Sequence, residues 1–114
     1  MNQPKLFEQS TESVTLEDVL LYALGDFQSR GKVLANRELA LDRLHGAFLR
    51  AFVRFGIPEL SDAQIVEGLR NLGTKIVEVP NYVAKRPYRV KISRQIAARC
   101  MTFYRNAASN TESI

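Results

Sequence analysis

Apolar residues recur at helical spacing near the start of the chain. They predict a helix over residues 15–30, with Thr15 as its N-cap, Asp18 completing a capping box and Gly31 as its stop. The positions that repeat at this spacing are Leu16, Val19, Leu20, Ala23, Leu24 and Phe27. One face of this helix is therefore expected to lie in the core.

A second apolar pattern predicts a longer helix that ends at Phe55. Asn36 is the expected N-cap, and the run from Gly56 to Pro58 stops the helix. The apolar face consists of Ala40, Leu44, Ala47, Phe48, Ala51, Phe52 and Phe55. Gly46 leaves open a break that would divide this element into two shorter helices.

Residues 61–73 predict a third and shorter helix. Ser61 and Gln64 form a second capping box, and Gly73 follows the last apolar position. The apolar face consists of Ile65, Val66, Leu69 and Leu72.

Two β-rich runs, bounded by prolines, predict a β-hairpin after the third helix. Residues 75–79 alternate between polar and apolar side chains before Pro80, and residues 88–92 alternate after Pro87. In the second run the inward positions are Tyr88, Val90 and Ile92, and the outward positions are Arg89 and Lys91. The strand's own period of two therefore displays basic side chains to water.

A final helix is expected after Ser93, whose side chain can cap it. Its apolar positions cover a wide arc and are Ile96, Ala97, Cys100, Met101, Phe103 and Tyr104. Such a face packs either deep in the fold or against a second copy of the chain. In the second case a homodimer interface would contain Ile96, Cys100, Met101, Phe103 and Tyr104.

Together these elements predict an α+β fold that is mostly α, with a winged-helix-like three-helix core, a two-stranded hairpin and a C-terminal helix. A chain of 114 residues is long enough for one core without disulfide or metal support. We expect one domain over residues 14–105. The polar segments 1–13 and 106–114 are expected to be flexible tails.

The order of the elements resembles the winged-helix superfamily of DNA-binding domains. The likeness covers residues 15–92 and is carried by SDAQIVEGLRNLGTKIVEVPNYVAKRPYRVKI, in which Leu69, Leu72 and Gly73 end a helix just before the first strand. In that family the third helix usually enters the major groove, and the hairpin, called the wing, contacts phosphates or the minor groove. The resemblance therefore implies binding to double-stranded DNA.

The charge of the chain is strongly polarised. Residues 75–105 hold eight basic side chains against one acid, Glu78, a net charge of +7, whereas residues 1–74 hold eight basic and ten acidic side chains. A local positive potential of this kind favours a polyanionic partner. Solubilising charges on an exposed hairpin would give the same pattern, since they also block aggregation between strand edges.

The wing carries most of the candidate nucleic-acid-binding residues. They are Lys85 and Arg86 at the loop tip, Arg89 and Lys91 on the strand behind it, Tyr82 beside the tip, and Lys75 on the first strand. We expect phosphate contacts from these residues and insertion of Arg86 into a minor groove. The third helix adds Arg70, Asn71 and Gln64, but its acids Asp62 and Glu67 would repel a phosphate backbone.

No motif of an enzyme, cofactor site or metal site occurs in the chain. His45 and Cys100 are its only histidine and cysteine, which excludes a Cys/His metal site, and Cys100 lies on an apolar stripe typical of a buried residue. Glycine-rich phosphate loops and nucleophile motifs are absent. Without an apolar leader or an 18-residue apolar run, we expect a cytoplasmic, non-enzymatic protein with no membrane partner.

Three functions remain open. The first is a DNA-binding protein, either a transcriptional regulator or an accessory factor of a DNA-processing complex; a continuous basic surface from the wing to Arg70 or to the second helix's arginines would favour it. The second is a winged-helix or helical adaptor that binds proteins without nucleic acid, which a large exposed apolar patch would favour. The third is an RNA-binding hairpin, which needs Tyr82 and Tyr88 exposed at base-stacking spacing.

Overall fold

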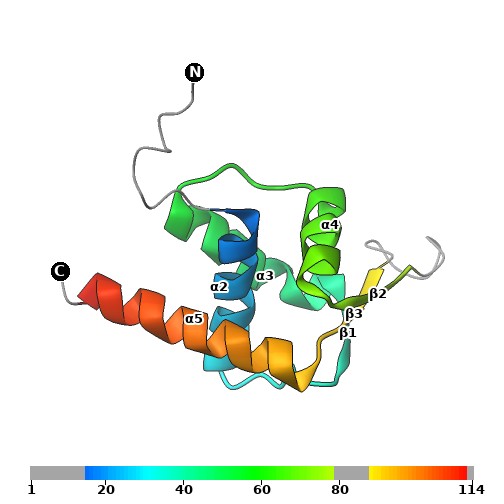
Figure 1. Cartoon of the computed structure of the whole chain (residues 1–114). Helices are drawn as coiled ribbons and strands as arrows, with labels where there is room; N and C mark the ends of the chain where they lie inside the picture. The colour runs from blue at the N-terminus through cyan, green and yellow to red at the C-terminus, as the bar shows by residue number, and fades with distance from the viewer. Residues whose placement is uncertain (1–14, 79–87, 113–114) are drawn as a thin grey trace.

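The computed structural model describes residues 15–78 and 88–112 of the chain. Their elements follow in the order α2 (Leu16–Ser29), β1 (Glu38–Ala40), α3 (Leu41–Phe55), α4 (Asp62–Leu72), β2 (Lys75–Glu78), β3 (Tyr88–Lys91) and α5 (Arg94–Glu112). Figure 1 shows the helices packed around α2, with the small sheet at one end of the molecule. The fold is α+β and mostly α, as the sequence predicts.

Short-range capping signals set the ends of α2 and α4. The Thr15 side chain accepts a hydrogen bond from the Asp18 backbone N–H, and Ser61 accepts one from Gln64, so both predicted capping boxes are present. Gly73 ends α4 with φ at 97°, a left-handed conformation that glycine adopts without strain. The two predicted helices are thus confirmed.

The prediction of a helix starting at Asn36 is wrong over its first residues. Asn36 has a left-handed φ of 57°, and Glu38–Ala40 form strand β1. Helix α3 begins only at Leu41, and then runs without a break through Gly46. Strand β1 forms because the edge of β3 offers backbone hydrogen bonds, a tertiary interaction that overrides the local helix preference.

The three strands form an antiparallel sheet in the order β1-β3-β2. Leu39, Val90 and Ile76 lie opposite one another and face the core, while Glu38, Lys91 and Lys75 form the neighbouring row on the other face. Val90 and Ile92 are buried and Lys91 is exposed, which confirms the predicted alternation over these three residues, whereas Tyr88 and Arg89 are both half-buried. The loop of the hairpin, residues 79–87, lies outside the described residues.

Helix α2 is the central helix, and α3, α4 and α5 all pack against it. From Val19 to Phe27 every residue except Tyr22 is buried. The α2 and α5 backbones come closest at Gly25, where a Cβ atom would lie 2.4 Å from Tyr104 Cβ and 2.5 Å from the Cys100 carbonyl oxygen. Only glycine therefore permits this packing distance.

Helix α5 is longer than its apolar pattern indicates. Its start is capped as predicted, because the Ile96 N–H donates to Ser93 Oγ at 3.2 Å. Its end at Glu112 includes residues 106–112, which we expected to belong to a flexible tail. The segment has no proline or glycine to stop the helix, and Arg54 of α3 donates to the Ala107 carbonyl oxygen at 3.3 Å.

None of the helices in residues 15–78 and 88–112 is both long enough and apolar enough to cross a membrane.

Substituting Gly25→Ala should lower the free energy of unfolding by about 2 kcal/mol, because the added methyl group meets a backbone carbonyl that cannot rotate away. Urea unfolding followed by circular dichroism measures the change. The matched control is Gly46→Ala in α3, where the nearest atom would be Arg50 Nη1 at 3.4 Å. We expect that control to be neutral or to stabilise by up to ~1 kcal/mol; equal effects at the two sites would contradict the packing argument.

Candidate nucleic-acid interface

Several of the predicted basic residues gather on the outer face of the sheet. Lys75 on β2 and Lys91 on β3 are direct neighbours across the two strands, and both are exposed. Arg89 lies on the same face, two residues from Lys91 along β3. We call Lys75, Lys91 and Arg89 the basic sheet face.

One acid, Glu38, also lies on this face and forms an ion pair with one of its three basic side chains. Arg89 Nε donates to Glu38 Oε2 at 2.7 Å, in a pair whose side chains are 41% and 51% exposed. An exposed pair of this kind contributes little stability. Within the described part of the chain, the ammonium groups of Lys75 and Lys91 form no ion pair and are the available charges.

The end of α4 leads directly into β2, the strand that carries Lys75. Arg70 and Asn71 are exposed in the last turn of α4, and the chain then passes through Gly73 and Thr74 into β2. The Thr74 hydroxyl donates to the Leu69 carbonyl oxygen at 2.8 Å, which fixes this junction. The structure thus brings two of the three α4 candidates to the strand that carries Lys75.

Gln64, the third candidate on α4, lies apart from that group. Its side-chain Oε1 accepts a hydrogen bond from the Ser61 N–H at 2.9 Å, so it serves as part of the helix cap. Of the remaining candidates, Lys85, Arg86 and Tyr82 lie outside the described residues. Tyr88 packs half-buried against the core, which is not the exposed position that base stacking by an RNA-binding hairpin would need.

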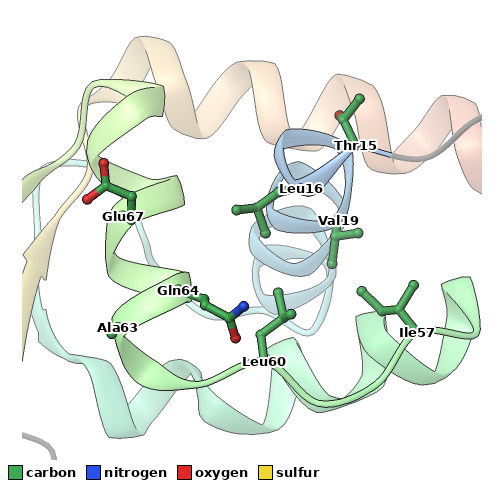
Figure 2. A pocket seen from close by; sticks show the side chains of 8 residues that line it. All are labelled: Thr15, Leu16, Val19, Ile57, Leu60, Ala63, Gln64 and Glu67. Carbon is green, nitrogen blue, oxygen red and sulfur yellow. The ribbon is translucent and has the colours of Figure 1, made fainter.

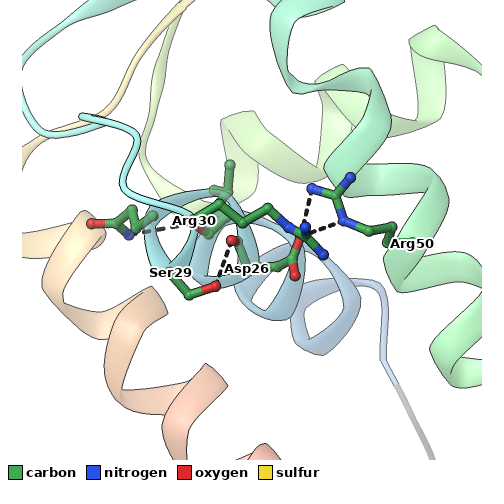
Figure 3. Close-up of polar contacts among 6 residues, drawn as sticks. Asp26, Ser29, Arg30 and Arg50 are labelled. Atoms are coloured by element: carbon green, nitrogen blue, oxygen red, sulfur yellow. Dashed lines mark hydrogen bonds and ion pairs between the residues drawn. The ribbon is translucent and has the colours of Figure 1, made fainter.

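The arginines of α3 are not an extension of this surface, because two of them bind other parts of the fold. Figure 3 shows Asp26, a buried carboxylate on α2, held by arginines from two elements. Arg50 Nε and Nη2 each lie 2.7 Å from Asp26 Oδ2, and Arg30 Nε lies 3.2 Å from it. Arg54 instead places its guanidinium carbon 5.4 Å from the centre of the Tyr22 ring. Arg43, the remaining arginine of α3, is exposed.

Most of the apolar face of α5 is covered within the chain itself. Cys100 is completely buried, and the Tyr104 ring lies 4.9 Å from that of Tyr22 on α2. Ile96, Met101, Phe103 and Tyr104 are half-buried. The burial of this helix is therefore explained without a second copy, and the homodimer stays a prediction.

Burial also determines the chemistry of the single thiol. It raises the pKa of Cys100 to about 12, although the nearby Arg99 acts in the opposite direction. The Cys100 thiol therefore stays protonated and unreactive at neutral pH. Among residues 15–78 and 88–112, no three His, Cys, Asp or Glu side chains come together in a way that could hold a metal ion.

Comparison with known protein families, with the sequences of curated proteins and with solved structures finds no significant match for this chain.

Substituting Arg50→Gln should lower the free energy of unfolding by roughly 1–2 kcal/mol, because the buried Asp26 carboxylate loses its closest charged donor. Arg43→Gln, seven residues earlier on the same helix and exposed, should change stability by less than about 0.5 kcal/mol. Both values come from denaturant titrations. Equal stability of the two variants would show that the Asp26 contact is not needed.

The raised pKa of Cys100 predicts a loss of stability in alkaline solution. The ordinary thiol pKa is 9.0, so above this pH the unfolded chain ionises while the folded chain does not, up to about pH 12. The contribution is complete below pH 9 and falls by at most ~1.4 kcal/mol per pH unit above it. Urea titrations of the wild type and of Cys100→Ala at pH 8 and pH 10.5 should show the steeper decline in the wild type; parallel declines would exclude this origin.

Proposed function

We propose that the protein binds double-stranded DNA without catalysing a reaction, and acts in the cytoplasm as a transcriptional regulator or as an accessory factor of a DNA-processing complex. The observation that carries the proposal is the adjacent, exposed pair Lys75 and Lys91, in which Lys75 starts the strand that follows Arg70 and Asn71 at the end of α4. The order of helix, strand, two helices and hairpin supports a winged-helix relationship as part of the same proposal.

The two neighbouring lysines repel each other, and a bound anion would remove this repulsion. Side chains directly opposite in an antiparallel pair have Cβ atoms about 5 Å apart, and like charges in such positions repel. The acid in the same row, Glu38, lies opposite Lys91 but is paired with Arg89, so one carboxylate is shared among three cations and does not balance the lysines. A phosphate backbone would neutralise both ammonium groups and release its own counterions. This arrangement favours a polyanion over a purely solubilising role for the charges.

This surface offers two types of contact to DNA, one to phosphates and one to base edges. Lysines on the sheet can bind phosphates, which gives affinity and orientation and little sequence preference. Arg70 and Asn71 have the side chains that pair with guanine and adenine edges in a major groove. Glu67 is exposed nearer the start of α4, so only the C-terminal end of this helix suits close approach to DNA. We therefore expect weak sequence selectivity carried by the end of α4.

Replacing both lysines with glutamine (K75Q/K91Q) should weaken binding to a random duplex by about tenfold in low salt. Each lost phosphate contact lowers the slope of log K against log salt by about 0.9. The slope should therefore fall by nearly two, since both lysines are exposed on one sheet face. Fluorescence anisotropy of a labelled 20-base-pair duplex, at several salt concentrations, measures both quantities.

Two further variants make the test specific. Arg105→Gln removes an exposed charge from the part of α5 far from the sheet and should leave the slope unchanged. Glu38→Gln releases Arg89 from its ion pair and should strengthen binding a few-fold. Equal slopes for K75Q/K91Q and the wild type would remove the sheet from the proposal. Failure of the wild type to bind duplex at 50 mM salt would overturn DNA binding altogether, and a preference for single-stranded RNA would replace DNA as the partner.

A further inference from the structure

An apolar groove opens between the first turn of α2, the α3–α4 connection and α4. It has a volume of about 570 Å³, and its apolar lining consists of Leu16, Val19, Ile57, Leu60 and Ala63. In Figure 2 Leu16 extends from α2 toward α4, Val19 extends toward Leu60 of the connection, and Glu67 stands on α4 with its carboxylate turned away from Leu16. The groove is separate from the basic sheet face, since none of its lining residues belongs to the sheet.

A close contact between α2 and α4 fixes one wall of this groove. Gly68 of α4 has no side chain, and a Cβ there would lie 2.5 Å from Leu20 Cδ1 and 2.9 Å from Leu16 Cδ2. One side of the Leu16 side chain therefore packs against α4, while 36% of the residue's surface stays exposed. An apolar side chain fixed in this way provides a preformed wall that a partner need not reorganise.

The charge around the groove is of one sign. Residues 15–29 and 55–69, which supply all the lining, contain six acidic side chains and no lysine, arginine or histidine. Asp26 belongs to the core cluster, Asp18 caps α2 and Glu17 pairs with Arg99. Of the other three, Asp62 is half-buried in the first turn of α4, whereas Glu59 and Glu67 are exposed, one next to Leu60 in the chain and the other in the lining. An apolar centre with an acidic border disfavours nucleic acid and favours a basic, amphipathic ligand.

We propose that this groove binds an amphipathic helix of a partner protein, with two or three apolar side chains at i, i+3 and i+4 spacing and lysine or arginine beside them. A groove walled by two helices is the common receptor for such a segment, which places its apolar side chains in the groove. The volume suits a few buried side chains. The protein would then hold DNA on its sheet and a protein partner in this groove.

Two occupants from the chain itself fit less well. Residues 1–14 carry one lysine against two acids, which is the wrong balance for an acidic border. A second copy would have to bring a basic apolar helix, and the apolar side chains that α5 would offer, Ile96 and Phe103, already pack against the core of their own chain. A partner of opposite charge is therefore the better match.

The test is an NMR titration of the full-length ¹⁵N-labelled protein with the model peptide LKKLLKLLKKLLKL. Binding should have a Kd of tens of micromolar, and the largest shift changes should be at the amides of Leu16, Leu60, Ala63 and Glu67. The peptide LEELLELLEELLEL has the same apolar spacing with the opposite charge and should bind at least tenfold more weakly. The variant K75Q/K91Q should bind the basic peptide like the wild type, so this result is independent of DNA binding.

Substitutions within the groove complete the design. Leu60→Asn and Glu67→Lys should each weaken peptide binding at least fivefold, because they remove the apolar contact and reverse the border charge. The matched controls are Val53→Asn, at a valine 81% exposed on α3 outside the groove, and Glu78→Lys on β2; neither should change binding.

Several outcomes would overturn the proposal. Shift changes outside the groove, equal binding of the two peptides, or an unchanged Kd in Glu67→Lys would exclude a basic helix as the ligand. Nuclear Overhauser contacts between the Ala63 methyl group and residues 1–14 in the free protein would make the N-terminal segment the occupant. Shifts of the groove amides that depend on protein concentration alone would identify a second copy.

Discussion

Close contact of α2 with its neighbours is the constraint on which the other features depend. Gly25 allows α5 to approach until a Cβ would overlap a carbonyl oxygen, and Gly68 of α4 allows the same for Leu20 of α2. At such short range the buried apolar side chains between Val19 and Phe27 lose almost all contact with water, and they form the centre of the core. The packing also brings Asp26 beside Arg50 and covers Cys100.

This helical framework positions the two surfaces to which we assign binding. The sheet is joined to it through β1, and the Asn36 N–H donates to the Ile92 carbonyl oxygen at 2.7 Å. Lys91 therefore lies on the central strand, paired with β1 on one side and β2 on the other, and Lys75 lies beside it on the edge strand β2. The groove depends on the other end of the framework, where Leu16 meets α4 at Gly68. Basic and acidic surfaces are thus supported by different contacts, so a polyanion and a basic helix need not compete.

The candidate site was predictable where its signal is local. Alternation in residues 88–92 correctly placed Lys91 in water and Val90 in the core, because a strand's side chains point to opposite faces regardless of the rest of the fold. The partners of charged groups were not predictable. Neither the pairing of Arg89 with Glu38 nor that of Arg50 with Asp26 follows from spacing, since each joins residues from separate elements. The buried position of Asp26 does have a signal in the sequence, because it is a single acid inside an otherwise apolar stretch.

The sequence by itself determined the helix ends with capping boxes, the hairpin strands and the segregation of charge, because these depend on neighbours within a few residues. Only the tertiary structure decided that Glu38–Ala40 form a strand, since that strand exists by pairing with β3, about fifty residues away. It also decided that the broad apolar face of α5 lies on α2. Hydrophobic patterning predicts that a helix face will be buried. Which surface buries it depends on the shapes of the two helices and on how closely their backbones can approach.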